Sequence, residues 1–256
     1  MIRLMLLLTM LLAVPVQAGT LLLAAASDLS YCIDELGAAF ARQTPQVQVK
    51  ASTGASGNFF AQIRNGAPFD VFLSADMAYP TQLARDGAAD PATLTPYAVG
   101  RIVVWTLDAR FDVKQGMRVF DDARLTRVAI ANPAIAPYGR AAKAALEAAG
   151  KWQAVQPKLV VGENISQAVQ FVQTGNAQVG IVSLASVVSP RLKGSGSYYL
   201  LPDGGLEPIV QGAVVTAHGK DNPLAARFVQ FLSSPAARAI LQRNGFGLPP
   251  QAVPRG

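Results

Sequence analysis

The strongest constraint on the fold of this chain is an alternation of short apolar runs with segments of helical spacing. The run from Thr20 to Ala25 is short and apolar, which favours a buried parallel strand. The apolar residues that follow recur on one helix face: Leu29, Cys32, Ile33, Leu36 and Phe40. Further strands are predicted at 46–51, 69–73, 101–106, 127–131, 159–161, 178–183 and 209–215. This alternation is typical of an α/β fold with mostly parallel strands.

The same pattern divides the chain into two parts. It restarts near Tyr97 to Arg101, and a return connection is expected near Leu201 to Gly205. A chain of 256 residues is long enough for two lobes with a core each. We therefore expect one lobe built from residues 19–98 and 204–256, and a second built from residues 99–203. A hinge between them would let the lobes close on a ligand.

The first 18 residues have the order of a secretory signal peptide. Arg3 precedes an apolar run from Leu4 to Val14, and Pro15 ends that run before the small residue Ala18. The run falls short of the roughly 20 residues that a membrane-spanning helix needs. We expect cleavage after Ala18 and a soluble mature protein in the periplasm.

Cysteine and charge exclude several other classes of protein. Cys32 is the single cysteine, so no internal disulfide can form, and its helical spacing favours a buried thiol over a lipid attachment site. The formal net charge of +6 is spread along the chain without interleaved aromatic residues, which argues against nucleic-acid binding. A mild positive field would still help to attract anions.

Four predicted strand-to-helix turns are built from small or hydroxyl residues. They are residues 25–28, 53–58, 136–139 and 163–166, two in each half of the chain. In open parallel sheets, ligands bind at the carboxyl ends of strands, where helices begin. Free backbone N–H groups and the helix dipole make such helix starts attractive to anions. Taken together, the four turns predict an anion site that needs no lysine or arginine.

Each turn taken alone has a simpler explanation. Residues of ordinary helix-capping types occur in three of the four turns: Ser27, Asp28, Ser56, Asn58 and Ser166. The agreement among four turns in an exported protein favours the anion site.

The same residues resemble the molybdate-binding proteins of ABC transporters. The segment from Ser56 to Asp76 resembles the most recognisable stretch of that family, and residues 25–27, 132–139 and 162–165 match in order and spacing. The resemblance covers essentially the whole mature chain. It implies a type II periplasmic binding fold with two lobes, each a mostly parallel sheet flanked by helices, and a ligand cleft between them. It also implies high-affinity capture of molybdate or tungstate and delivery to an ABC permease in the inner membrane.

The resemblance assigns the ligand contacts position by position. Ser27 and Ser56 would offer hydroxyl and backbone donors from the first lobe. Tyr138 and Ile165 would offer backbone N–H groups from the second lobe. Asp28 lies where relatives place a polar donor, and we expect its backbone N–H to matter more than its carboxylate.

Three further positions are possible contacts. Gly57 and Gly139 follow two of the assigned donors directly. Ser183 stands where some family members have a tyrosine that also binds the ligand. Tyr138, in its Ala-Pro-Tyr-Gly turn, is expected to replace that tyrosine in part.

The protonation state of the anion explains why molybdate or tungstate would fit a pocket of hydrogen-bond donors. Molybdate and tungstate carry no proton at neutral pH, so a pocket of donors satisfies every oxygen. Phosphate carries a proton that such a pocket leaves unpaired, at a cost of about 1–3 kcal/mol. The carboxylates of Asp28 and Glu163 would disturb this pocket if they pointed into it. We expect both to cap helix N-termini instead, where negative charge is favourable.

The residues present argue against a serine hydrolase and a zinc enzyme. A serine hydrolase needs a histidine base, but His218, the single histidine, lies in a predicted loop, and residues 54–58 lack the second glycine of a nucleophile elbow. No Cys/His cluster suits zinc. We therefore expect a binding protein and not an enzyme, and we expect no cofactor. Molybdenum would be bound only as the oxyanion, without a direct bond from a protein side chain to the metal. Sulfate or phosphate binding stays open, because a pocket of donors does not exclude sulfate. We expect the protein to act as a monomer.

Overall fold

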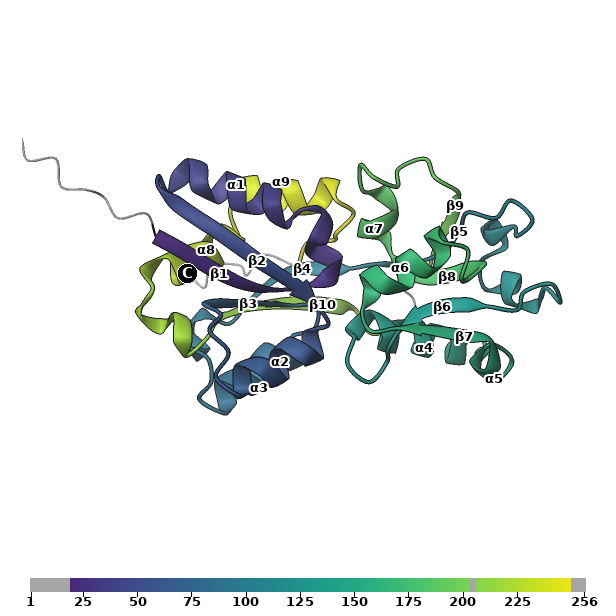
Figure 1. Cartoon of the computed structure of the whole chain (residues 1–256), viewed down its shortest axis with the longest axis horizontal. Helices are drawn as coiled ribbons and strands as arrows, with labels where there is room; N and C mark the ends of the chain where they lie inside the picture. The colour runs from purple at the N-terminus through teal and green to yellow at the C-terminus, as the bar shows by residue number, and fades with distance from the viewer. Residues whose placement is uncertain (1–18, 203–205, 250–256) are drawn as a thin grey trace, which may run out of the picture.

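The computed structural model describes residues 19–202 and 206–249 and shows two α/β lobes joined by two connections (Figure 1). The predicted signal peptide, residues 1–18, lies outside the described residues. Within the described ranges, no helix has the length and apolar character to cross a membrane.

Lobe 1 contains a five-stranded sheet in the order β2-β1-β3-β10-β4. Its strands are β1 (Gly19–Ala26), β2 (Val47–Gly54), β3 (Val71–Ser74), β4 (Thr95–Gly100) and β10 (Ile209–Val215). Its helices are η1 (Ser27–Tyr31), α1 (Ile33–Gln43), α2 (Ser56–Arg64), α3 (Ala78–Arg85), η2 (Pro91–Thr93), η5 (His218–Asp221), α8 (Pro223–Phe231) and α9 (Pro235–Arg243). Helices α1 and α9 lie on one face of the sheet, and α2 and α3 lie on the other (Figure 1).

Lobe 2 contains a second five-stranded sheet, in the order β7-β6-β8-β5-β9. Its strands are β5 (Ile102–Thr106), β6 (Val128–Ala131), β7 (Leu159–Gly162), β8 (Val179–Ser183) and β9 (Ser197–Leu200). Its helices are η3 (Val113–Asp121), α4 (Pro137–Ala148), α5 (Trp152–Val155), η4 (Gln156–Lys158), α6 (Ile165–Gln173) and α7 (Leu184–Val188).

The two sheets share one topology. In each sheet four strands run in the same direction, and the strand in fourth place, β10 or β5, runs in the opposite direction. The prediction of an α/β fold with a mostly parallel sheet in each lobe is confirmed. Because the parallel strands end at the same edge of each sheet, the helix starts that follow them gather at the boundary between the lobes.

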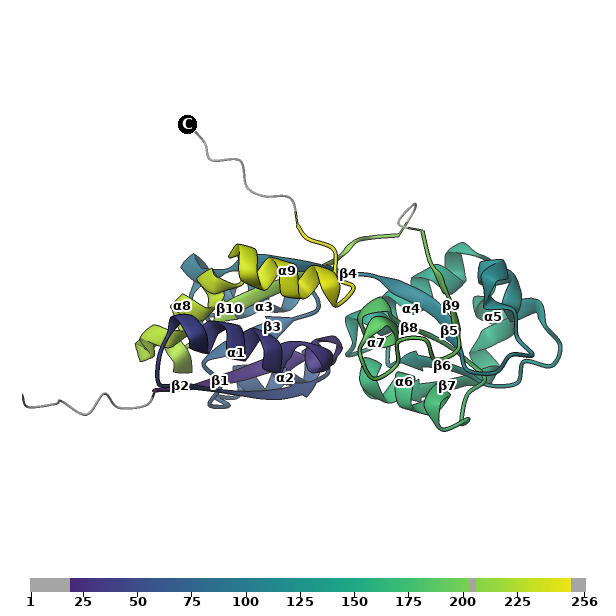
Figure 2. The same ribbon diagram turned by 90° about the horizontal axis from the view of Figure 1, so that it is seen from above.

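Two short connections join the lobes. Strand β4 ends at Gly100 and β5 begins at Ile102, whereas β9 ends at Leu200 and β10 begins at Ile209. Strand β4 pairs with β10 and β5 pairs with β9, so both connections join neighbouring strands of one sheet to neighbouring strands of the other (Figure 2). The lobe bounds taken from the sequence, at 98–99 and 203–204, remain predictions, and the second falls at residues outside the described ranges.

The apolar runs of the sequence form the core of each lobe. In lobe 1, Leu21 and Leu23 of β1 are fully buried, and in lobe 2 so are Val104 and Trp105 of β5. These strands read as nearly continuous apolar runs because helices cover both faces of each sheet. Cys32 is also buried, as predicted, and burial raises the pKa of its thiol.

The sequence pattern predicts no strand at β9, and it marks β4 only as a restart near Tyr97 to Arg101. Three of the four residues of β9, Ser197, Tyr198 and Tyr199, are exposed, and this strand forms the edge of the lobe 2 sheet. An exposed edge strand has no buried face and therefore no alternation of apolar and polar residues.

Candidate functional site

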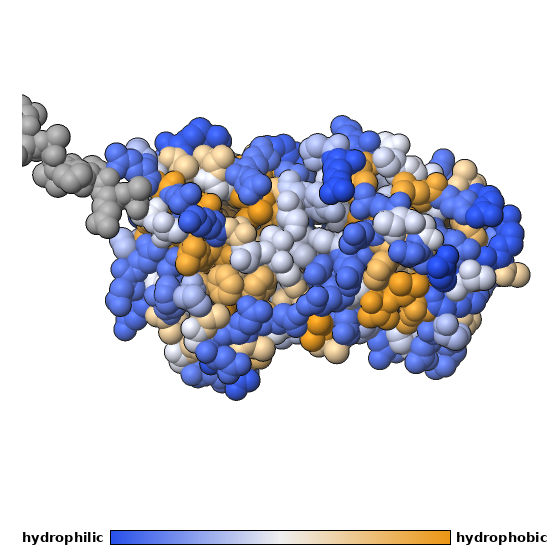
Figure 3. All heavy atoms as spheres, viewed as in Figure 1, coloured by the Kyte–Doolittle hydropathy of each residue, from blue (hydrophilic) through white to orange (hydrophobic). Residues whose placement is uncertain are grey.

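A small pocket lies between the lobes where the helix starts meet. Its lining residues are Ala26, Ser27, Asp28, Gly54, Ala55, Ser56, Ala75, Ala136, Pro137, Tyr138 and Ile165. The structure thus brings together all five residues that the sequence assigned to the ligand. Figure 3 shows the two lobes meeting along a seam of residues with intermediate hydropathy.

Three α-helices begin at this pocket, one in lobe 1 and two in lobe 2. Helix α2 begins at Ser56 and α6 at Ile165. Helix α4 begins at Pro137, which has no N–H, so Tyr138 is its first backbone donor. The first N–H groups of a helix have no acceptor within it. No side chain caps the starts of α2 or α4. The pocket is therefore lined with backbone donors and the positive ends of three helix dipoles.

The Ser56 hydroxyl is positioned as a further donor. Its oxygen accepts a hydrogen bond from the backbone N–H of Ala75 at 3.0 Å, and the side chain is almost fully buried. Because this bond uses the hydroxyl as acceptor, its proton is left to donate to a ligand. The backbone of Ser27 is fixed from lobe 2, since the hydroxyl of Ser166 donates to its carbonyl oxygen at 3.0 Å.

Asp28 is the centre of a buried polar network behind the pocket. Its Oδ2 accepts hydrogen bonds from the Tyr138 hydroxyl at 2.8 Å and from Gln211 Nε2 at 2.5 Å. Tyr97 in turn donates to Gln211 Oε1 at 2.7 Å. The other carboxylate oxygen, Oδ1, is buried and has no partner among the described residues. Burial raises the pKa of this carboxyl, and the hydrogen-bond donors near it, of which Gln211 and Tyr138 have the largest effect, offset the rise only in part.

The expectation that Asp28 and Glu163 cap helices is wrong. Helix α6 is capped by Asn164, whose side chain accepts from the backbone N–H of Gln167 at 3.1 Å. The neighbouring Glu163 reaches across the boundary instead and accepts from Asn58 Nδ2 of lobe 1 at 2.6 Å. The Asp28 carboxylate also bonds across the boundary, because a tyrosine hydroxyl of the other lobe is available to it.

Further contacts hold the lobes together at the cleft. The Arg140 guanidinium of lobe 2 pairs with Asp76 of lobe 1 and donates to the Tyr79 hydroxyl at 3.2 Å. The backbone N–H of Gly57 donates to the carbonyl oxygen of Ile135 at 2.9 Å. The structure is therefore that of closed lobes.

The three possible contacts named from the sequence have other partners. Gly57 uses its N–H for the bond between lobes, and the N–H of Gly139 donates to Ala136 at 2.9 Å. A Cβ on Gly139 would lie 2.3 Å from the carbonyl oxygen of Ala131, so glycine lets α4 start close to β6. Ser183 is fully buried outside the pocket lining, with its hydroxyl 2.6 Å from that of Ser186.

The described residues hold no group of three or more His, Cys, Asp or Glu side chains that suits a metal ion. His218 does not line the pocket; its Nδ1 lies 3.5 Å from Asp70 Oδ1. Ser56 therefore has no histidine base within the pocket lining, and its surroundings suit hydrogen bonding to an anion.

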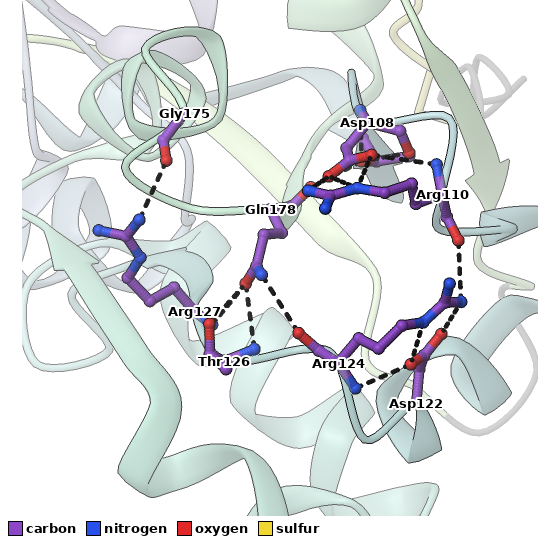
Figure 4. A network of polar contacts seen from close by, with 9 residues as sticks. Asp108, Arg110, Asp122, Arg124, Thr126, Arg127, Gly175 and Gln178 are labelled. Carbon is purple, nitrogen blue, oxygen red and sulfur yellow. Dashed lines mark hydrogen bonds and ion pairs between the residues drawn. The ribbon is translucent and has the colours of Figure 1, made fainter.

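Arg110, Arg124 and Arg127 of lobe 2 belong to a network of polar contacts (Figure 4) and are not among the residues that line the pocket. Arg110 pairs with Asp108 and Arg124 with Asp122, at 2.6 Å in both cases. Hydrogen bonds from these arginines lower the pKa of each carboxyl to about 2. The side-chain amide of Gln178 bonds to the backbone of Arg124 and Arg127. Because their charge is neutralised by carboxylates, Arg110 and Arg124 brace the loops and do not form an anion site.

Sequence reasoning missed the network behind the pocket and the pair at its rim. Gln211 is fully buried in β10, and Arg140 lies one turn into α4. A single polar residue within the apolar run Ile209–Val215 was the available signal for Gln211. The partner of Arg140 belongs to the other lobe, so no local pattern marks it.

Two similar sheets, a double connection and a donor-lined cleft between them define a two-lobed solute-binding protein. Residues 21–247 match the family of bacterial extracellular solute-binding proteins. The molybdate-binding protein ModA of Rhodobacter capsulatus is 40% identical over 236 residues, which is 92% of this chain and 91% of that protein. ModA of Azotobacter vinelandii is 38% identical over 238 residues, 93% of this chain and 94% of that protein.

A solved structure extends this similarity to the fold. The periplasmic molybdate-binding protein of Azotobacter vinelandii matches with a TM-score of 0.84 at 34% identity, covering 90% of this chain and 100% of that chain. The chain therefore belongs to the bacterial extracellular solute-binding proteins, in the group that contains the ModA proteins. The resemblance to this family and the two-lobed fold are confirmed.

Proposed function

We propose that this protein captures molybdate, and also tungstate, in the periplasm and delivers the anion to an ABC importer. The observation that carries the proposal is the pocket itself, where the starts of α2, α4 and α6 and the Ser56 hydroxyl converge without a lysine or arginine. The relatives named ModA are molybdate-binding proteins, and their similarity extends over nearly the whole chain. A binding protein, not an enzyme, is the function that these features support.

The donors determine which anions fit. Backbone N–H groups and a serine hydroxyl satisfy oxygens that carry no proton. Molybdate and tungstate are unprotonated at neutral pH, so each oxygen can accept from this pocket. Protonated phosphate would bring a donor into a set of donors, and an unpaired buried polar group costs about 1–3 kcal/mol. The five proposed ligand residues are Ser27, Asp28, Ser56, Tyr138 and Ile165.

Capture involves closure of the two lobes around the connections at Arg101 and between β9 and β10. A ligand that touches both lobes stabilises the closed form by its higher affinity for that form. The pocket has a volume of about 10 Å³, close to what one water needs. A tetrahedral oxyanion is larger, so we expect residues that line the pocket to shift when it binds, while the contact between Gly57 and Ile135 is kept.

The periplasmic location, the inner-membrane permease and the monomeric state are parts of this proposal. A secretory signal peptide over residues 1–18 would supply the export that it requires. The permease would recognise the closed lobes, since only the closed form presents both lobe surfaces in a fixed arrangement.

Sulfate is the second candidate ligand, because it is also unprotonated and a set of donors does not exclude it. The test is a calorimetric titration of the mature protein with molybdate, tungstate, sulfate and phosphate, followed by competition among them. We expect molybdate and tungstate to bind tightly and to displace sulfate. Tighter binding of sulfate would make this a sulfate-binding protein, and binding of none of the four would contradict the proposal.

A further inference from the structure

Asp28 is the one acidic or basic side chain among the residues that line the pocket. It is fully buried, and its two carboxylate oxygens differ in their surroundings. Oδ2 accepts hydrogen bonds from Tyr138 and Gln211, whereas Oδ1 is buried without a partner in the described parts of the chain. A buried charged oxygen without a partner is costly. This carboxyl therefore stands beside the proposed anion site with one oxygen left free to hold a proton.

No cation lies within hydrogen-bonding reach of this carboxyl among the described residues. The titratable groups that face it are the hydroxyls of Tyr138 on α4 and Tyr97 on β4 and the thiol of Cys32. Helices α6 and α7 pack against η1, and neither contains an acidic or basic residue. Strand β1 has none either.

The remaining charged residues nearby are either exposed or paired. In β2 the basic residue is Lys50, which is exposed, and in α1 Asp34 and Glu35 are exposed acids. Arg140 of α4 is paired with Asp76 at the rim of the cleft. The charge of Asp28 is thus balanced only by neutral hydrogen-bond donors.

The charges at the site do not balance when a dianion is bound. Each helix N-terminus acts like about half a positive charge, so α2, α4 and α6 together supply roughly +1.5. An unprotonated oxyanion brings a charge of −2, which these helix ends nearly offset. An ionised Asp28 would raise the total negative charge in this buried space to −3. Protonation of the carboxyl removes this excess.

We propose that this protein takes up one proton on Asp28 Oδ1 for each oxyanion that it binds. This inference rests on the proposed function, since it requires an unprotonated dianion in the pocket. The proton comes from solvent, and Oδ2 keeps its bonds from Tyr138 and Gln211. Burial already raises the pKa of this carboxyl, and a nearby dianion raises it further because like charges disfavour ionisation. The bound species is therefore the dianion together with a neutral carboxylic acid.

The direct test needs no variant. Molybdate is titrated calorimetrically into the mature wild-type protein at several pH values between 6.5 and 9.5, in pairs of buffers with different ionisation enthalpies. The dependence of the measured heat on the buffer gives the number of protons taken up. We expect this number to approach one where Asp28 is ionised in the free protein. In that range the affinity should fall by up to tenfold per pH unit.

Asp28→Asn isolates the residue responsible. Asparagine keeps an oxygen that can accept from Tyr138 and Gln211, and its Nδ2 takes the place of the protonated Oδ1. We expect no proton uptake, an affinity that does not change with pH, and tighter binding than wild type at pH 9.5. Glu147→Gln is the matched control, because this exposed carboxyl pairs with Lys143 on the surface of α4. It should keep the wild-type proton uptake.

The outcomes separate this inference from the proposed function. Tight binding of molybdate by wild type with no proton uptake at any pH overturns the inference and leaves the function standing. Proton uptake that persists in Asp28→Asn also overturns it, since another group then titrates. Failure of both proteins to bind molybdate or tungstate at any pH would contradict the proposed function itself.

Discussion

The backbone N–H of Gly57 in lobe 1 donates a hydrogen bond to the carbonyl oxygen of Ile135 in lobe 2, with a nitrogen-to-oxygen distance of 2.9 Å. This is a main-chain contact between the lobes, beside the proposed ligand residue Ser56. It is possible because Gly57 has no side chain: a Cβ there would lie 2.8 Å from the same carbonyl oxygen and 3.0 Å from the Tyr79 hydroxyl. A methyl group at this position would therefore press against the backbone of the other lobe in the closed form.

Replacing Gly57 by alanine should weaken anion binding without weakening the fold. The added methyl group obstructs closure, whereas alanine favours a helix by about 1 kcal/mol over glycine. We expect molybdate affinity to fall at least tenfold in calorimetric titration. The melting temperature of the ligand-free protein should stay the same or rise. A loss of both affinity and melting temperature would point to misfolding and contradict this account.

Replacing Ser56 by alanine should remove one donor to the anion. A hydrogen bond to a charged group contributes about 1.5–3 kcal/mol, so molybdate affinity should fall at least tenfold. The variant also leaves the N–H of Ala75 without its acceptor, which lowers the melting temperature. Ser52→Ala, at an exposed position of β2, is the control and should bind as wild type does. Unchanged affinity in Ser56→Ala would remove this residue from the site.

The ion pair between Arg140 and Asp76 should contribute little to affinity. Both side chains are partly exposed, 41% for Arg140 and 28% for Asp76, and such pairs are worth about 0–1 kcal/mol. We expect Arg140→Gln to weaken molybdate binding by less than about fivefold, with a smaller effect at high salt. A double-mutant cycle with Asp76→Asn measures the pair directly. A loss above a hundredfold would show that Arg140 contacts the anion.

The Asp28 carboxyl should make the stability of the ligand-free protein depend on pH. Its pKa is raised in the folded protein, so the folded state binds the proton more tightly than the unfolded state. Stability is then lost as the pH rises from the unfolded pKa to the folded pKa, by about 1.4 kcal/mol per unit of difference. Asp28→Asn should therefore melt higher relative to wild type at pH 8 than at pH 4. An equal difference at both pH values would contradict this.

Much of the fold follows from patterns that are local in the sequence. The run Thr20–Ala25 is buried because its residues are apolar, and Pro223 and Pro235 stand at the first positions of α8 and α9, where proline is favoured. The five residues assigned to the ligand from the helix starts and the family resemblance all line one pocket. The position of a residue at the start of a helix can be predicted from the sequence, whereas its contact with a ligand stays a prediction.

The directions of the polar side chains could not be predicted in the same way. Asp28 and Glu163 are residue types that often cap helices. In the structure, however, Asp28 bonds to Tyr138 of the opposite lobe, and Glu163 bonds to Asn58 of the opposite lobe. Those partners lie more than a hundred positions away in the chain. Which partner a carboxylate takes depends on how the lobes pack, and sequence spacing carries no information about that.

Strand β10 lies between β3 and β4, although it follows the whole of lobe 2 in the chain. During synthesis from the N-terminus, every strand of lobe 2 is therefore made before β10, the last strand of the lobe 1 sheet. Lobe 2, whose five strands come from one continuous segment, can fold first, and lobe 1 must wait for Ile209–Val215 to join β3 to β4. A chain that stops before residue 209 would lack β10, so β4 and one edge of β3 would have no strand to pair with. Unpaired strand edges make such a chain prone to aggregation.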